Sequence, residues 1–286
     1  MLLIKKAVLT VILALPLMAI AQNDMPQQDG VSVGKPSALR NLVPAEVLER
    51  QSSAQYDQLK NKAASEQALV PEDNAQTKRL RAIAAKLIPF TPRFNPRAKD
   101  WNWEVNLIAS KEINAFCMPG GKIAFYTGLL NTLKLTDDEV AMVMGHEIAH
   151  ALREHARAQM AKSSITNIGA NVLGQFLGNG RYTNLFQAGG DLLGLKFSRN
   201  DESEADVVGL DLAARAGYDP RAGIRLWEKM SEASKNNPPQ WLSTHPSGTN
   251  RINAMQKHMP EVLPLYAQAT GQQVDALRPY GAKKKD

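Results

Sequence analysis

The sequence predicts an α+β fold that is mainly helical and contains one small antiparallel sheet. Through most of the chain, apolar residues recur every three or four positions, as on the buried face of an amphipathic helix. Alternation of apolar and polar residues stands out in one region, between residues 103 and 127. The chain has 286 residues, of which 44% are hydrophobic and 22% charged, and this is enough for one domain with a substantial core.

The first residues have the pattern of an export signal. Lys5 and Lys6 precede an apolar stretch over residues 7–21 that ends in a small-x-small triplet. The stretch is short for a membrane span. We therefore expect a cleaved signal peptide at residues 1–21. No cysteine lies near the cleavage position, so a lipid-anchored N-terminus is not expected.

The rest of the chain is expected to form one domain. Residues 22–40 are rich in Gln, Asp, Gly, Pro and Ser, which is typical of a flexible leader. The domain would then cover residues 41–286, with its core at about 75–260. Residues 163–195 are weakly apolar and interrupted by glycines. They could form a lid over a functional site or a helical hairpin packed on the core.

Charge and cysteine content exclude some functions. The formal charge is +6, or about +4 without the two leader lysines, and the basic residues are scattered. We find no basic and aromatic groove for nucleic acid and no nucleophile elbow. Cys117 is the single cysteine, so no internal disulfide can form, and we expect a buried structural thiol.

The pattern places the elements as follows. Helices are expected at 44–69, 75–89, 136–162 and 199–216, and after Pro220 and Pro246. Strands are expected at 103–108, 112–118 and 122–127, with a turn at 119–121.

One predicted helix carries a metal-binding motif. It begins with a capping box, Thr136 to Glu139, that fixes the helix start. His146 and His150 then lie one turn apart on one face, so both imidazoles can bind one Zn²⁺. Glu147 follows the first histidine and can reach a metal-bound water without being a ligand, as a general base must.

The third ligand must come from elsewhere in the chain. The metzincin pattern needs glycine and histidine where this sequence has Arg153 and Ala156, so that class is excluded. His155 is off register, and we expect it on the surface, as we do His258.

A second acidic helix supplies the ligand. Glu202 and Asp206 are four residues apart and share a helix face, whereas Glu204 points about 200° away from Glu202. We assign Glu202 as the ligand, Asp206 as the acceptor that orients a zinc histidine, and Glu204 as a solvent-facing acid. The small residues Gly145 and Gly209 would let the two helices pack closely.

These motifs together resemble the HtpX-like zinc metallopeptidases. This family is related to the CAAX prenyl proteases and includes the periplasmic BepA and LoiP groups. The similarity covers roughly residues 75–260 and includes HExxH, the downstream ExxxD, and stretches at 114–130, 197–199, 243–246 and 251–252. The sequence departs from BepA in having no C-terminal helical repeat, and from membrane-embedded members in having no second apolar span.

The resemblance implies a zincin-like endopeptidase with one Zn²⁺ per chain. His245 should lie beside the zinc, either stabilising the oxyanion or occupying the fourth metal position at rest. Arg251 is a weaker candidate for contact with the transition state or the substrate. The hairpin that contains Asn114 and Phe116 would bind extended substrate.

The biological role follows from the same resemblance. Unfolded or misfolded envelope proteins in the periplasm would be the substrates, with peripheral association with the outer membrane or its assembly machinery. The alternative is a zinc-stabilised chaperone or assembly factor with little proteolytic activity. An intact Glu147 disfavours this alternative, because a purely structural zinc site needs no base.

Overall fold

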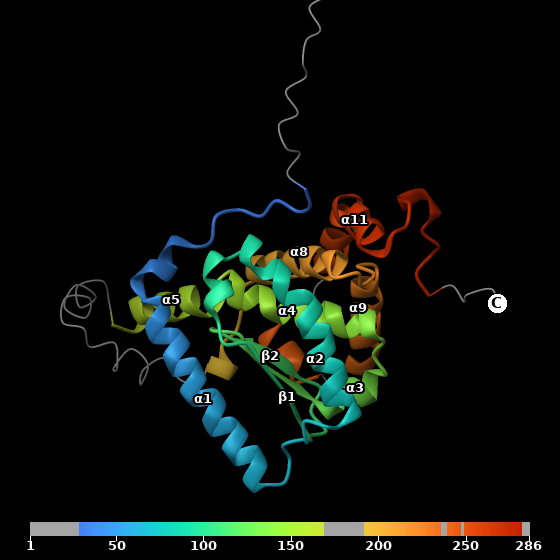
Figure 1. Ribbon diagram of the computed structural model, residues 1–286. Coiled ribbons are helices and arrows are strands. Elements are labelled where there is room, and N and C mark those ends of the chain that lie inside the picture. Colours follow the sequence, from blue (N-terminus) through green and yellow to red (C-terminus); the bar gives the residue numbers. More distant parts are fainter. Residues whose placement is uncertain (1–28, 169–191, 236–238, 247–248, 282–286) are drawn as a thin grey trace, which may run out of the picture.

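Helices surround a small sheet, as the sequence predicts (Figure 1). The computed structural model describes residues 29–168, 192–235, 239–246 and 249–281. The helices in these ranges are α1 (Ala45–Ser65), α2 (Ala75–Leu87), α3 (Thr127–Leu133), α4 (Asp137–Leu152), α5 (His155–Ile168), α8 (Arg199–Arg215), α9 (Ala222–Ser234), α10 (Trp241–Thr244) and α11 (Thr249–Thr270). The strands are β1 (Glu104–Ile108), β2 (Ala115–Met118) and β3 (Lys122–Tyr126). None of the helices in the described part of the chain is long and apolar enough to cross a membrane.

The sheet is mixed, which corrects the expectation of an antiparallel sheet. Its strand order is β1-β3-β2. Strands β2 and β3 form the expected hairpin, with Gly120 and Gly121 at φ 84° and 81° in a turn that favours glycine. Strand β1 pairs with β3 in parallel. Alternation along a strand shows which face is buried but not which neighbour it pairs with, so the sequence did not reveal that β3 lies in the middle.

Helices α4 and α8 form the centre of the molecule. Their backbones approach closely where Gly145 faces Gly209. A Cβ atom built on Gly209 would lie 2.9 Å from the backbone nitrogen of His146, and one on Gly145 would lie 3.0 Å from the carbonyl oxygen of Gly209. The expected close packing is confirmed, and it brings the two predicted ligand segments together.

Helix α4 begins as predicted but ends early. Thr136 and Glu139 make both hydrogen bonds of the capping box. The helix stops at Leu152, and Glu154 has the left-handed φ of 57° before α5 starts. The expectation of one helix over 136–162 was therefore wrong. Glu154 pairs with Arg40 and Arg157, and such tertiary contacts are invisible to helix periodicity.

The N-terminal segment lies against α8. The backbone nitrogen of Val31 donates to Oδ2 of the buried Asp211 at 3.0 Å, and the carbonyl oxygen of Asp29 accepts from Arg215 at 2.6 Å. The described part of the expected leader thus begins with residues that contact the core. The expected signal peptide and most of the segment at 163–195, including any lid, lie outside the described residues.

Close packing of α4 on α8 predicts that Gly209→Ala is destabilising. The added methyl group meets backbone atoms that cannot move aside, and such overpacking costs about 1–3 kcal/mol. Thermal unfolding followed by circular dichroism should show a lower Tm. Gly194→Ala is the control, because a Cβ there has no neighbour within 4 Å. Equal melting temperatures for the two variants would contradict the packing argument.

Candidate metal centre

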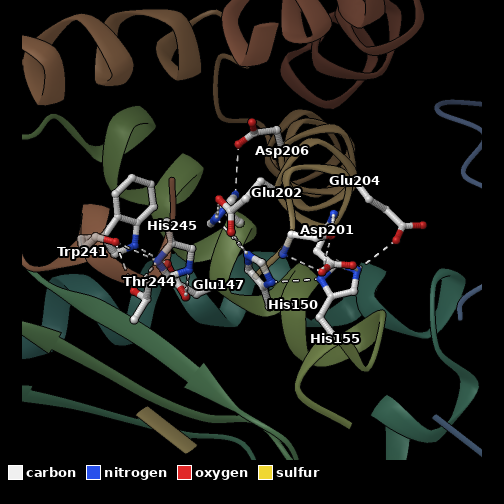
Figure 2. A network of polar contacts seen from close by, with 12 residues as sticks. Glu147, His150, His155, Asp201, Glu202, Glu204, Asp206, Trp241, Thr244 and His245 are labelled. Atoms are coloured by element: carbon white, nitrogen blue, oxygen red, sulfur yellow. Dashed lines mark hydrogen bonds and ion pairs between the residues drawn. The ribbon is translucent and has the colours of Figure 1, made fainter. Parts of the chain in front are cut away.

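Four predicted residues meet at one point in the structure. His146, His150, Glu202 and His245 are buried, and their donor atoms all lie within 4.8 Å of one another. Figure 2 shows three of these residues, His150, Glu202 and His245, beside Glu147. The two histidine Nε2 atoms are 3.1 Å apart, and Nε2 of His150 is 3.4 Å from Oε1 of Glu202. Helix α4 supplies both histidines of the motif and α8 supplies Glu202, so the α4–α8 contact assembles the cluster.

The residues present fit a divalent metal ion. Among the described residues, Oε1 of Glu202 and Nε2 of His245 are buried without a hydrogen-bond partner, and Oε2 of Glu202 has only its ion pair with Arg251, an arrangement that is costly unless a further cation binds there. Burial raises the pKa of Glu202 to about 9, although Arg251 opposes the shift, and a cation would restore the charged form. Burial also lowers the pKa of His146 to about 4, so its imidazole is neutral and can ligate. Neutral imidazoles with a carboxylate are a donor set that suits Zn²⁺.

Asp206 orients the first histidine. Nδ1 of His146 donates to Oδ1 of Asp206 at 3.0 Å, which directs Nε2 toward the cluster. Nε and Nη2 of Arg251 donate to the two oxygens of Asp206 at 2.6 and 2.7 Å. Burial opposes ionisation of Asp206, but Arg251 and His146 outweigh it and hold its pKa below the usual value. The structure thus brings Asp206 to the place that the sequence assigned to it.

Arg251 lies behind the cluster and not in the cleft. Its Nη1 is 2.6 Å from Oε2 of Glu202, and its guanidinium lies 3.9 Å from the ring centroid of Trp227. The side chain is buried and does not line the cleft beside the cluster. Two buried carboxylates thus hold the guanidinium behind the ligands, and the expected contact of Arg251 with substrate or transition state stays a prediction.

Glu147 lies beside the cluster and lines the cleft. Nε1 of Trp241 donates to its Oε1 at 2.6 Å. Burial raises the pKa of Glu147 to about 8, and the bond from Trp241 and the charge of Arg251 oppose this shift. The carboxylate is close to the ligands without being one, which suits a base that acts on a water molecule.

His245 comes to the cluster from the end of α10, whereas the other three residues lie on α4 and α8. It stacks on Trp241 with ring centroids 4.7 Å apart, and its Nδ1 donates to the carbonyl oxygen of Trp241 at 3.1 Å. With its proton on Nδ1, the neutral ring directs the lone pair of Nε2 at the other ligands. Burial lowers the pKa of His245 well below its usual value, which favours this neutral form.

The cleft runs along β2. Asn114, Phe116 and Cys117 line it, together with Phe197 and Thr244 from later in the chain. Oδ1 of Asn114 accepts from the backbone nitrogen of Ala115 at 3.0 Å. Cys117 is buried as expected, which raises the pKa of its thiol well above the usual value.

His155 and Glu204 were misjudged from the sequence. Nδ1 of His155 lies 3.0 Å from Nδ1 of His150, and its Nε2 donates to Oε2 of Glu204 at 2.9 Å (Figure 2). His155 is 4% exposed, so it is not a surface residue, and Glu204 is partly buried. In one continuous helix, His155 would lie on a different face from His150. The left-handed turn at Glu154 brings the two side chains together, and the sequence pattern did not predict this turn. His258 is only partly exposed and pairs with Glu261 on α11.

The role of Trp241 was also missed. It contacts both Glu147 and His245, but the sequence shows only a tryptophan in a short segment between prolines. The available signal was its position just before residues 243–246, the stretch that resembles the metallopeptidase family and contains His245.

The fold and the cluster together define a zincin-like metallopeptidase. Two packed helices supply His, His and Glu, and a free glutamate follows the first histidine. The chain belongs to peptidase family M48, whose model matches residues 74–259.

Relatives of three kinds support this assignment. The mitochondrial metalloendopeptidase OMA1 of Arabidopsis thaliana is 41% identical over 167 residues, which cover 58% of this chain and 34% of the relative. The metalloprotease LoiP of Escherichia coli is 28% identical over 215 residues, covering 73% of this chain and 82% of LoiP. The β-barrel assembly-enhancing protease of Yersinia pestis is 33% identical over 174 residues, 53% of this chain and 35% of that protein. The chain thus spans about a third of the first and third of these proteins.

The geometry predicts that Glu202→Ala abolishes stoichiometric zinc binding, because it removes the one carboxylate of the cluster and leaves the buried cation of Arg251 unpaired beside the remaining imidazoles. Metal analysis of the purified protein by mass spectrometry should give close to one zinc per chain for the parent and far less for the variant. His258→Ala, which alters a histidine outside the cluster, should keep its zinc. Full zinc in Glu202→Ala would exclude this residue as a ligand.

Proposed function

We propose that the protein is a zinc-dependent endopeptidase that hydrolyses peptide bonds in extended or unfolded protein segments. The observation that carries this proposal is the position of Glu147, buried beside the His–His–Glu cluster, held by Trp241 and facing the cleft. A purely structural zinc site has no use for a carboxylate that lies beside the ligands and faces a cleft.

The chain's own residues divide the work of hydrolysis. His146, His150 and Glu202 would hold the Zn²⁺, which polarises a carbonyl and lowers the pKa of a bound water. Glu147 accepts the proton of the attacking water and passes it to the leaving amine. Trp241 fixes the carboxylate of Glu147 through one oxygen, which leaves the other oxygen to accept that proton. Asp206 and Arg251 keep His146 and Glu202 in place.

The outer edge of β2 supports binding of extended substrate, because no strand in the described part of the chain pairs with it. Strand β2 is at the edge of the sheet and lines the cleft. Tyr126 donates its backbone N–H to Asn114, so by the alternation of an antiparallel ladder the backbone groups of Ala115 and Cys117 point away from β3. A substrate strand could pair there with little dependence on its sequence. Asn114 and Phe116 would contact it, and Asn114 would release the N–H of Ala115.

His245 is proposed to close the site at rest. Two roles are compatible with its place beside the cluster, but an oxyanion stabiliser must donate from Nε2. The carbonyl oxygen of Trp241 can only accept, so we assign the proton of His245 to Nδ1; Nε2 then presents a lone pair, which supports the role of a fourth ligand. The segment that carries His245 also contacts the substrate edge, because the backbone nitrogen of Trp241 donates to the carbonyl oxygen of Ile113.

We propose the periplasm as the site of action and misfolded envelope proteins as the substrates. The apolar stretch after Lys5 and Lys6 and the name of the β-barrel assembly-enhancing relative support this. The name of the β-barrel assembly-enhancing protease also motivates the proposal of peripheral association with outer-membrane assembly. A zinc-stabilised chaperone remains the alternative function, and the arrangement of Glu147 favours the protease.

Replacing the base separates the two functions. Glu147→Gln keeps the shape and the hydrogen bond from Trp241 but cannot accept a proton. We expect full zinc content and a loss of about 10²–10⁴-fold in casein cleavage. Unchanged cleavage in a zinc-loaded Glu147→Gln variant would rule out the proposed mechanism.

Replacing His245 separates its two roles. If it closes the site at rest, His245→Ala should raise the initial rate of casein cleavage while zinc remains bound through the other three ligands. Gln240→Ala, at an exposed neighbouring position, is the control. A fall of about 10²–10³-fold in kcat would instead identify His245 as the oxyanion stabiliser.

A further inference from the structure

We propose that His155 and Glu204 form a positioning relay that fixes the orientation of the zinc ligand His150. This inference rests on the metal site of the proposed function and adds two residues to it. His150 is a ligand whose second ring nitrogen needs a partner, because a free imidazole would rotate about its side-chain bonds. The structure supplies that partner from α5, on the far side of the helix break.

The hydrogen bonds of the relay have one consistent assignment. Metal binding through Nε2 leaves the proton of His150 on Nδ1, so Nδ1 donates to Nδ1 of His155 across 3.0 Å. Nε2 of His155 then carries its own proton and donates to Oε2 of Glu204 across 2.9 Å. The carboxylate is held by Arg153, whose Nε donates to Oε1 at 2.9 Å. Each bond has one donor and one acceptor, so the relay selects a single tautomer of both histidines.

The ring of His150 is held on two sides, by the relay and by Phe197. Phe197 stacks on the ring of His150 with centroids 4.0 Å apart and an interplanar angle of 30°. It restricts the ring from the face, whereas His155 restricts it from the edge. Both ring nitrogens of His155 have partners, and the residue stands outside the cluster of donor atoms. His155 is therefore a positioning residue and not a further ligand.

The arrangement repeats the one at His146. There, Nδ1 donates to Asp206, and Asp206 is held by Arg251. At His150 the carboxylate is Glu204 and the arginine is Arg153, with His155 inserted between ligand and carboxylate. Glu204 lies on a different face of α8 from Asp206, so an imidazole is needed to span the distance.

The relay also reaches the N-terminal segment. Nη2 of Arg153 donates to the carbonyl oxygen of Gly34, in addition to the bond from its Nε to Glu204. Arg153 is 5% exposed, and this burial restricts its guanidinium. The segment before α1 thus contacts the residue that holds the carboxylate end of the relay.

Zinc affinity tests the relay. His155→Leu removes both hydrogen bonds and fills the space with an apolar side chain of similar size. His155→Gln can still accept from His150 and donate to Glu204. We expect the Kd for zinc, measured by competition with a chromogenic chelator, to rise about 10–100-fold for the leucine variant and much less for the glutamine variant. His258→Leu is the matched control and should bind as the parent does.

Two further measurements exclude a purely structural effect. The Co²⁺-substituted leucine variant should show shifted d–d bands, because the ligand field changes when His150 reorients, whereas loss of stability alone leaves the bands in place. Glu204→Gln keeps the shape of the carboxylate and carries the test if the leucine variant does not fold; we expect a smaller loss of zinc affinity. Unchanged affinity and unchanged bands in the folded variants would overturn the relay.

The outcomes also separate this inference from the proposed function. A parent protein and a His245→Ala variant that both bind zinc but leave casein intact would contradict the peptidase and leave the relay to be judged on affinity alone. A parent that cleaves casein, with His155→Leu binding zinc equally well, would contradict the relay and leave the peptidase in place.

Discussion

The close approach of α4 and α8 is the contact on which the rest of the site depends. Gly145 and Gly209 face each other, and side chains in either place would meet backbone atoms at about 3 Å. This approach sets Glu202 within reach of His146 and His150, and it sets Asp206 behind His146. The metal centre is thus a property of a helix interface, in which small residues determine where the ligands lie.

The buried carboxylates around the cluster need nearby positive charges to offset the cost of burial, and buried arginines supply them. Asp206 and Glu202 meet Arg251, and Glu204 meets Arg153. Arg251 is itself covered by Trp227, so it cannot turn toward solvent without losing that contact. The cation of Arg251 does not fully offset the burial of Glu202, whose pKa stays raised to about 9. A divalent ion at the cluster would remove that remaining cost, which links metal binding to the stability of the core.

Most elements could be predicted because their signals are local. The capping box at Thr136 set the start of α4, and the i, i+4 spacing set the shared face of His146 and His150. Glu202 could be chosen over Glu204 because helix geometry alone separates their faces. The middle position of β3 and the end of α4 at Leu152 could not be predicted, because both depend on partners distant in sequence.

The sequence by itself determined the metal-binding residue types, their helices and the family that they resemble. Tertiary structure alone decided what surrounds them. It placed Arg251 behind the ligands, and it brought His155 to His150 through the left-handed turn at Glu154. Periodicity describes one element at a time, whereas the position of a buried charge depends on which elements meet. Apart from that of Asp206, which shares a helix face with Glu202, the orienting contacts of the site therefore became visible only once the helices were packed.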